Sequence, residues 1–116
     1  MKENEKRKAP RVPVSMNVDQ ASGFKTFGFG YATNISEEGI AVDAEAVAEP
    51  AKLPSIGDQV RLKFKLPKSN IVIATLGRVI RLDTDKHPPT VAFSFPELTS
   101  EFRYEVKRYV SITSRN

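Results

Sequence analysis

Apolar and polar residues alternate with a period of two along this 116-residue chain, and this pattern limits the possible folds more than any other feature. Successive side chains of a β-strand point to opposite faces, so an alternating stretch predicts a strand with one buried face. The pattern is clearest at 60–66, where Arg61, Lys63 and Lys65 separate apolar residues. Further strands are predicted, from alternation or from aromatic and β-branched residues, at 12–18, 24–35, 40–43, 71–82 and 91–95.

Residues that favour turns separate the predicted strands. The segment 36–39 is expected to be the bend of a hairpin, and 19–23 is expected to be the turn before it. The strand at 71–82 is long enough to bend near Gly77. Other turns or loops are expected at 44–55, with a short helical turn, and at 56–58, 67–70 and 83–89.

After Pro96 the spacing of the apolar residues changes from two to about four, which is typical of an amphipathic helix. Thr99 or Ser100 is expected to cap this helix, which should cover about 97–113, and Tyr104 is the best candidate for an exposed aromatic residue. Antiparallel strands followed by one helix predict an all-β-dominated domain, a small barrel covered by that helix. The residues expected on its buried face are Phe102, Val106, Tyr109, Val110 and Thr113.

The length of the chain corresponds to a single domain. We expect residues 1–11 to form a flexible basic arm and residues 12–116 to form the barrel with its helix. The sequence has no run of about 18 apolar residues and no signal-peptide pattern, so a cytoplasmic protein without membrane insertion is expected. The absence of cysteine excludes a disulfide scaffold and a cysteine-based zinc site.

Positive charge is concentrated at the N-terminus. Residues 1–11 hold five basic and two acidic side chains, a net charge of +3, whereas the remaining 13 basic and 12 acidic residues give only +1. Long nucleic acids are bound through many distributed basic side chains. The nearly neutral body therefore argues against nucleic-acid binding and favours a small anion held by the arm.

Two short polar motifs carry the functional information. Arg7 and Arg11 have an Arg-x-x-x-Arg spacing, and Asn34, Ser36 and Gly39 have an Asn-x-Ser-x-x-Gly spacing at a predicted hairpin bend. Guanidinium groups bind phosphates and the Hoogsteen edge of guanine through two parallel hydrogen bonds. Taken separately, the motifs are explained by a solvated basic tail and an ordinary turn. Together they indicate a guanine-nucleotide receptor.

The two motifs resemble those of the PilZ domain, and so do the turn at Gly57-Asp58, the Gly77-Arg78-Val79 strand and the terminal helix. PilZ domains are six-stranded antiparallel β-barrels of bacteria that bind the second messenger cyclic di-GMP. The resemblance covers nearly the whole chain, and the motifs occur in the expected order and structural context. It implies the same fold and the same ligand here.

The resemblance also implies a role for each motif residue. Arg7 and Arg11 would bind phosphate and guanine, while Asn34 and Ser36 would contact guanine. Gly39 would keep the turn open and tolerate a positive φ.

Two further positions bear on ligand binding. Lys6 precedes the first motif arginine, where many relatives have arginine, and a basic residue there implies two stacked ligand molecules per chain. Arg81 stands where some relatives carry tryptophan near the bound base. A guanidinium group can also stack on a purine.

Three functional classes are compatible with these observations. A cyclic di-GMP receptor that signals to an unidentified protein partner is favoured, and the alternatives are a PilZ-like interaction module without ligand and a small basic nucleic-acid-binding barrel. No catalytic set can be assembled, so neither enzymatic activity nor a cofactor is expected. Asp83, Asp85 and His87 are more simply explained as a polar loop than as a metal site.

Overall fold

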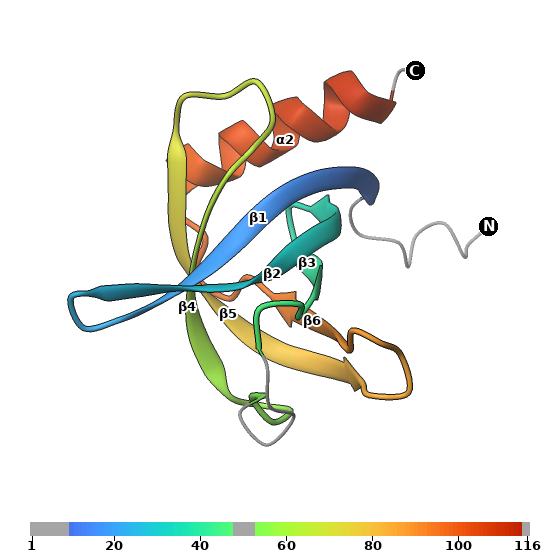
Figure 1. Cartoon of the computed structure of the whole chain (residues 1–116). Helices are drawn as coiled ribbons and strands as arrows, with labels where there is room; N and C mark the ends of the chain where they lie inside the picture. The colour runs from blue at the N-terminus through green and yellow to red at the C-terminus, as the bar shows by residue number, and fades with distance from the viewer. Residues whose placement is uncertain (1–9, 48–52, 115–116) are drawn as a thin grey trace.

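A computed structural model describes residues 10–47 and 53–114 of the chain. Its strands close into an antiparallel barrel in the order β1-β2-β3-β6-β5-β4, and one helix packs against β1 and β2 (Figure 1). The predicted six-stranded barrel with a C-terminal helix is therefore confirmed. Its elements are β1 (Val12–Ser22), β2 (Lys25–Ser36), β3 (Gly39–Asp43), β4 (Gln59–Lys65), β5 (Val72–Asp83), β6 (Thr90–Ser94) and α2 (Ser100–Ser114).

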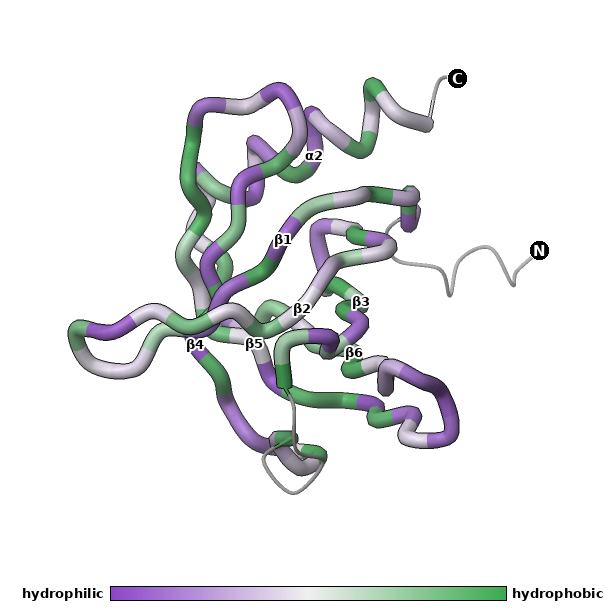
Figure 2. Tube along the Cα trace, viewed as in Figure 1, coloured by the Kyte–Doolittle hydropathy of each residue, from purple (hydrophilic) through white to green (hydrophobic). Residues whose placement is uncertain are grey.

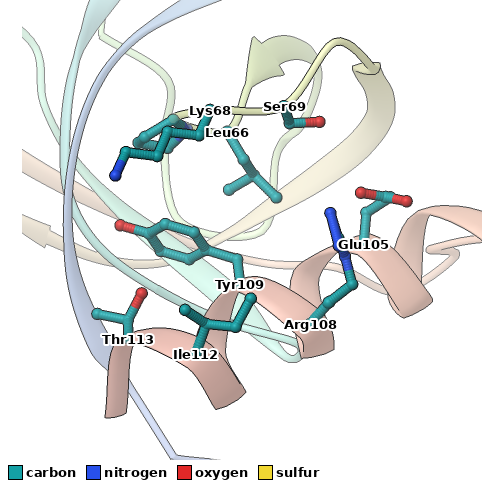
Figure 3. Close-up of a pocket in the computed structure, with 9 residues that line it drawn as sticks. Leu66, Lys68, Ser69, Glu105, Arg108, Tyr109, Ile112 and Thr113 are labelled. Atoms are coloured by element: carbon teal, nitrogen blue, oxygen red, sulfur yellow. The ribbon is translucent and has the colours of Figure 1, made fainter. Parts of the chain in front are cut away.

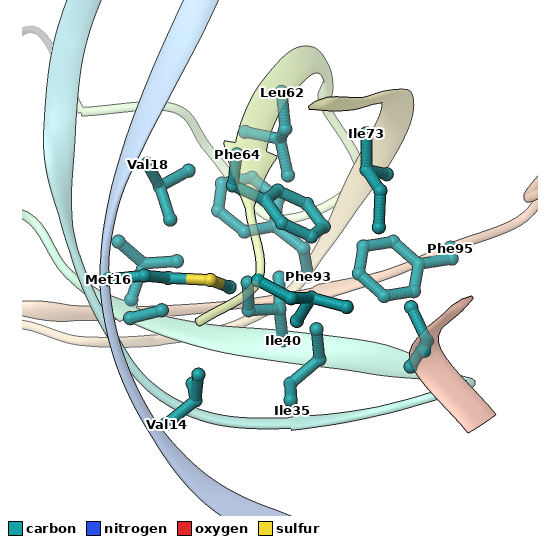
Figure 4. Packing of buried hydrophobic residues seen from close by; sticks show 14 of the residues in the cluster. Val14, Met16, Val18, Ile35, Ile40, Leu62, Phe64, Ile73, Phe93 and Phe95 are labelled. Atoms are coloured by element: carbon teal, nitrogen blue, oxygen red, sulfur yellow. The ribbon is translucent and has the colours of Figure 1, made fainter. Parts of the chain in front are cut away.

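One face of each strand points into the barrel and forms its core. Hydrophobic and hydrophilic residues are interspersed along the strands (Figure 2), and in β1 buried and exposed residues alternate as the sequence predicts. Aromatic rings fill the centre of the core (Figure 4). Phe29 meets Phe93 edge to face with ring centroids 5.6 Å apart, and Phe64 stacks on Phe95 at 6.1 Å. The buried residues of β1 are Val12, Val14, Met16 and Val18.

The hairpin of β1 and β2 is longer than the sequence predicts. The expected turn at 19–23 is wrong for its first four residues, which continue β1, and the chain reverses only from Gly23. Asp19 pairs with Gly28 of β2 on one side and with Lys63 of β4 on the other. Pairing on both sides outweighs the turn preference of a few polar residues. Gly23 has a φ of 62°, which suits glycine at the reversal.

A one-residue bulge interrupts the pairing of β5 with β6. Val79 pairs with Phe93 and Arg81 pairs with Ala92, so Ile80 is the extra residue. A bulge of this kind lets two consecutive residues face the same side of a sheet. Ile80 and Arg81 are accordingly both exposed.

Gly77, where the sequence predicts a bend, pairs regularly with Val60 of β4. The irregularity of β5 thus lies three residues later, at the bulge. Gly77 has a packing role instead. A Cβ atom at this position would lie 2.6 Å from Cδ1 of Leu62 and 3.0 Å from Cδ1 of Phe93, and both of these side chains are buried.

Helix α2 begins at the predicted cap. The Thr99 hydroxyl accepts a hydrogen bond from the backbone N–H of Phe102 at 3.4 Å, and its carbonyl accepts one from the N–H of Arg103 at 2.8 Å. Val106 and Val110 are buried, while Tyr104 is exposed as expected. Within the described ranges, no helix has the length and apolar character needed to span a bilayer.

The segment expected as a loop at 44–55 is described only in part. A turn follows β3, in which the N–H of Val47 donates to the carbonyl of Ala44 at 3.3 Å. Residues 48–52 lie outside the described residues, so the short helical turn expected within 44–55 stays a prediction.

We expect Gly77→Ala to lower the free energy of unfolding by about 1–3 kcal/mol, because the new methyl group would overpack two buried side chains. Chemical denaturation measures this change. Gly28→Ala is the matched control, since a Cβ atom there would lie 3.5 Å from Cβ of Ala46, an ordinary contact. Equal destabilisation by the two substitutions would contradict the packing role of Gly77.

Candidate ligand-binding site

Outward-facing residues of four adjacent strands form two parallel rows on the barrel. In the first row, the register places Asn34 of β2 beside Ala41 of β3, followed by Ala92 of β6 and Arg81 of β5. The adjacent row of paired residues is buried in the core, which shows that the first row faces outward. That inner row consists of Ile35, Ile40, Phe93 and Val79.

The second outward row lies on the other side of this buried row. It runs from Ser36 through Gly39 and Ser94 to Arg78. Neighbouring strands are about 4.8 Å apart, so a row across four strands spans roughly 14 Å. Each row thus has a polar side chain on β2, small residues in the middle and an arginine on β5.

An open cleft of about 200 Å³ lies at these rows. It brings together the sequence-predicted residues that the structure describes, although they come from three separate strands and the end of the arm. Lys6 and Arg7 lie outside the described residues. The predicted residues that line the cleft are Arg11, Asn34, Ser36, Gly39 and Arg81.

Small residues line the middle of the cleft. Ala41 and Ala92 lie between Asn34 and Arg81, and Ser94 continues this surface beside them. Local sequence patterns carry no signal for these three small residues, because they meet only where β3 pairs with β6, two strands far apart in the chain. A surface of short side chains between polar ends can accommodate a flat base.

The bulge at Ile80 determines where Arg81 points. With regular pairing after Val79, Arg81 would have the same parity as Val79 and would face the core. The extra residue moves Arg81 to the outer face, where it pairs with Ala92 and lines the cleft. Alternation alone assigns Arg81 to the wrong face, and the sequence carries no clear signal for a bulge.

Ser36 has a structural role in addition to the predicted ligand contact. Its hydroxyl oxygen accepts a hydrogen bond from the backbone N–H of Glu38 at 3.0 Å, and the residue is only 5% exposed. This contact fixes the bend between β2 and β3. A hydroxyl has one proton to donate, so Ser36 can still donate to a ligand while it holds the turn.

Of the two expected reasons for glycine at position 39, the structure supports the lack of room for a side chain and not the positive φ. Positive φ angles among the described glycines occur at Gly23 and Gly57 and not at Gly39, so the expectation of a positive φ is wrong. A Cβ atom at Gly39 would instead collide with the backbone carbonyl oxygen of Phe93. Glycine is required here because β3 and β6 approach closely at the edge of the cleft.

Charge in the cleft favours an anionic ligand. Arg11 is exposed immediately before β1, and the pairing of Pro13 with Asn34 brings this end of β1 beside the second motif. Arg11 and Arg81 line the cleft together with one acidic residue, Glu38. The two guanidinium groups can bind phosphate or stack on a base, and Asn34 can hydrogen-bond its edge.

A second hollow lies elsewhere on the barrel, between α2 and the β4–β5 turn (Figure 3). It measures about 290 Å³ and contains none of the residues predicted to bind ligand. Among the described residues, no group of three His, Asp or Glu side chains could hold a metal ion. The cleft over the two outward rows is therefore the candidate site.

The fold and this cleft together define a small β-barrel domain with a candidate site for an anionic ligand on its outer face. A protein-family model described as the PilZ domain matches residues 5–111. The chain therefore belongs to the PilZ domain family, as its motifs indicate. No curated protein matches the chain.

Three solved structures have the same fold. The inhibitor of motility MotI/DgrA of Bacillus subtilis is 21% identical with a TM-score of 0.76, covering 95% of this chain and 52% of that one. The PilZ domain of YcgR from Escherichia coli with c-di-GMP is 18% identical with a TM-score of 0.65, covering 94% and 92%. YcgR in complex with c-di-GMP is 15% identical with a TM-score of 0.70, covering 94% and 46%. The chain thus spans about half the length of MotI/DgrA.

We expect Ser36→Ala to lower the free energy of unfolding without ligand by about 0.5–1.5 kcal/mol, because it removes the hydrogen bond that fixes the turn. Thermal or urea unfolding of the ligand-free protein measures the change. Ser15→Ala on the exposed face of β1 is the control and should alter stability little. If Ser36→Ala is as stable as the parent chain, the hydroxyl has no structural role in the turn.

Proposed function

We propose that this chain is a receptor for cyclic di-GMP that performs no chemistry on its ligand. The observation that carries the proposal is the convergence of Arg11, Asn34, Ser36, Gly39 and Arg81 on one cleft. Membership of the PilZ family supports it. So does the similar PilZ domain of YcgR, whose structure is described with c-di-GMP.

The proposed contacts follow from the chemistry of the ligand. Arg11, together with Arg7, binds phosphate oxygens and the N7 and O6 atoms of guanine. Asn34 hydrogen-bonds the edge of the base, and Ser36 donates its hydroxyl proton. Arg81 stacks on the purine in place of an aromatic ring. The alanine surface between Asn34 and Arg81 lets the base lie flat against the barrel.

We further propose that the output is a change of surface. Bound ligand would fill the cleft and, together with Arg11, present a surface that a protein partner recognises. Such a receptor needs no catalytic groups of its own. We propose that it acts in the bacterial cytoplasm. A ligand-free interaction module would not require Arg11, Asn34 and Arg81 to meet at one cleft, so the receptor is favoured over that alternative.

We expect Arg11→Ala to nearly abolish binding of cyclic di-GMP and Ser36→Ala to weaken it less. Loss of a charge-assisted contact at a largely desolvated site costs on the order of 2–5 kcal/mol, against about 1 kcal/mol for a neutral hydrogen bond. Isothermal titration calorimetry measures both affinities.

Arg61→Ala is the matched control for this experiment. Arg61 is an exposed arginine on β4 that lies outside the proposed cleft, so its loss removes the same charge without removing a proposed contact. Binding by Arg11→Ala at the affinity of Arg61→Ala would refute the site assignment. A parent chain that binds a single-stranded oligonucleotide but not cyclic di-GMP would refute the proposed function.

We expect two stacked cyclic di-GMP molecules to bind per chain. Each ligand brings two phosphates, and residues 1–11 offer five basic side chains to neutralise them. Calorimetry at concentrations where free ligand is monomeric should saturate at two molecules for the parent chain and at one for Lys6→Ala. Lys2→Ala, which removes the same charge further from the motif, should leave the stoichiometry at two. Saturation of the parent chain at one ligand would remove the proposed role of Lys6.

A further inference from the structure

Helix α2 contacts the backbone beside the first half of the proposed site. The hydroxyl of Tyr109 donates a hydrogen bond to the carbonyl of Pro13 at 3.2 Å. Figure 3 shows this hydroxyl pointing away from α2 toward β1. Pro13 lies two residues after Arg11 and pairs with Asn34. Tyr109 therefore fixes the start of β1, where the arm joins the barrel.

The same helix contacts the second half of the site through Arg103. One nitrogen of its guanidinium group lies 3.6 Å from the Glu37 carboxylate and donates to the Glu37 carbonyl at 3.4 Å. The other nitrogen donates to the Leu98 carbonyl at 3.5 Å, which fixes the guanidinium at the start of the helix. Glu37 is one of the two residues between Ser36 and Gly39, so Arg103 links this turn to α2.

The turn is held from the other side by the residue that follows β6. The N–H of Phe95 donates to the carbonyl of Glu38 at 2.9 Å. The turn is thus fixed between the end of β6 and the first half of α2, while the start of β1 is fixed by the second half of α2. The helix therefore contacts both segments from which the ligand contacts are proposed to come.

We propose that α2 positions both halves of the ligand site, with Tyr109 as the positioning residue for Arg11 and Arg103 as the positioning residue for the Asn34–Gly39 turn. This inference rests on the proposed function of the cleft. Neither side chain lines the cleft, so neither is proposed as a ligand contact. Coupling free energies are reciprocal, so bound ligand in turn stabilises the docking of α2 on the barrel.

Calorimetry with cyclic di-GMP tests the proposal through Tyr109→Phe and Arg103→Met. Each substitution should raise Kd roughly three- to tenfold, the effect of one or two lost hydrogen bonds. Tyr104→Phe and Arg108→Met are the matched controls on the same helix. Among the described residues, neither Tyr104 nor Arg108 donates a side-chain hydrogen bond to the barrel, so both controls should bind like the parent chain. Arg103→Lys, which keeps the charge but loses the planar group, replaces Arg103→Met if that variant does not fold.

Double-mutant cycles separate positioning from a general loss of stability. Tyr109→Phe should lose most of its effect on Kd in an Arg11→Lys background and keep it in an Asn34→Ala background. Arg103→Met should show the opposite pattern. Equal effects in every background, or unchanged affinity of both single variants, would overturn the positioning role while the parent chain still binds. Absence of binding by the parent chain would overturn the proposed function, and this inference with it.

Discussion

The pairing of β3 with β6 is the interaction on which the rest of the structure depends. Two meanders, β1-β2-β3 and β4-β5-β6, become one closed barrel only because β3 pairs with β6 and β1 pairs with β4. The first of these seams also forms the middle of the candidate site. Asn34 belongs to one meander and Arg81 to the other, and the two alanines between them face each other across the seam. Gly39 permits this seam, since any side chain there would meet the backbone of Phe93.

Local features of the fold could be predicted from the sequence because they depend on the spacing of apolar residues and on residues that favour turns. The alternation at β1 and β4, the hairpin bend at 36–39 and the Thr99 cap are all present in the structure. The length of the β1–β2 hairpin could not be predicted in this way. It depends on pairing of Asp19 with a strand that lies far along the chain.

The residues of the candidate site could be predicted from the sequence, but their arrangement in space could not. Arg11 and Asn34 are predicted from motifs whose chemistry suits a guanine nucleotide, Arg81 is predicted from its place in the resemblance to PilZ domains, and the structure brings all three to one cleft. The small residues between these side chains come together through the register of β3 with β6. The face on which Arg81 lies depends on the bulge at Ile80. Such information is absent from local sequence patterns, as a one-residue shift moves a side chain to the opposite face.

The bulge at Ile80 also has a consequence for the reliability of folding. If β5 paired with β6 without the extra residue, the guanidinium of Arg81 would enter the core opposite Val91, where no described acidic group is buried to receive it. Burial of an unpaired charge costs several kcal/mol, a large part of the stability of a small domain. The pairing without the bulge would both remove Arg81 from the ligand site and bury its charge in the core. Arg81, the side chain proposed to stack on the ligand, therefore also disfavours incorrect pairing of β5 with β6.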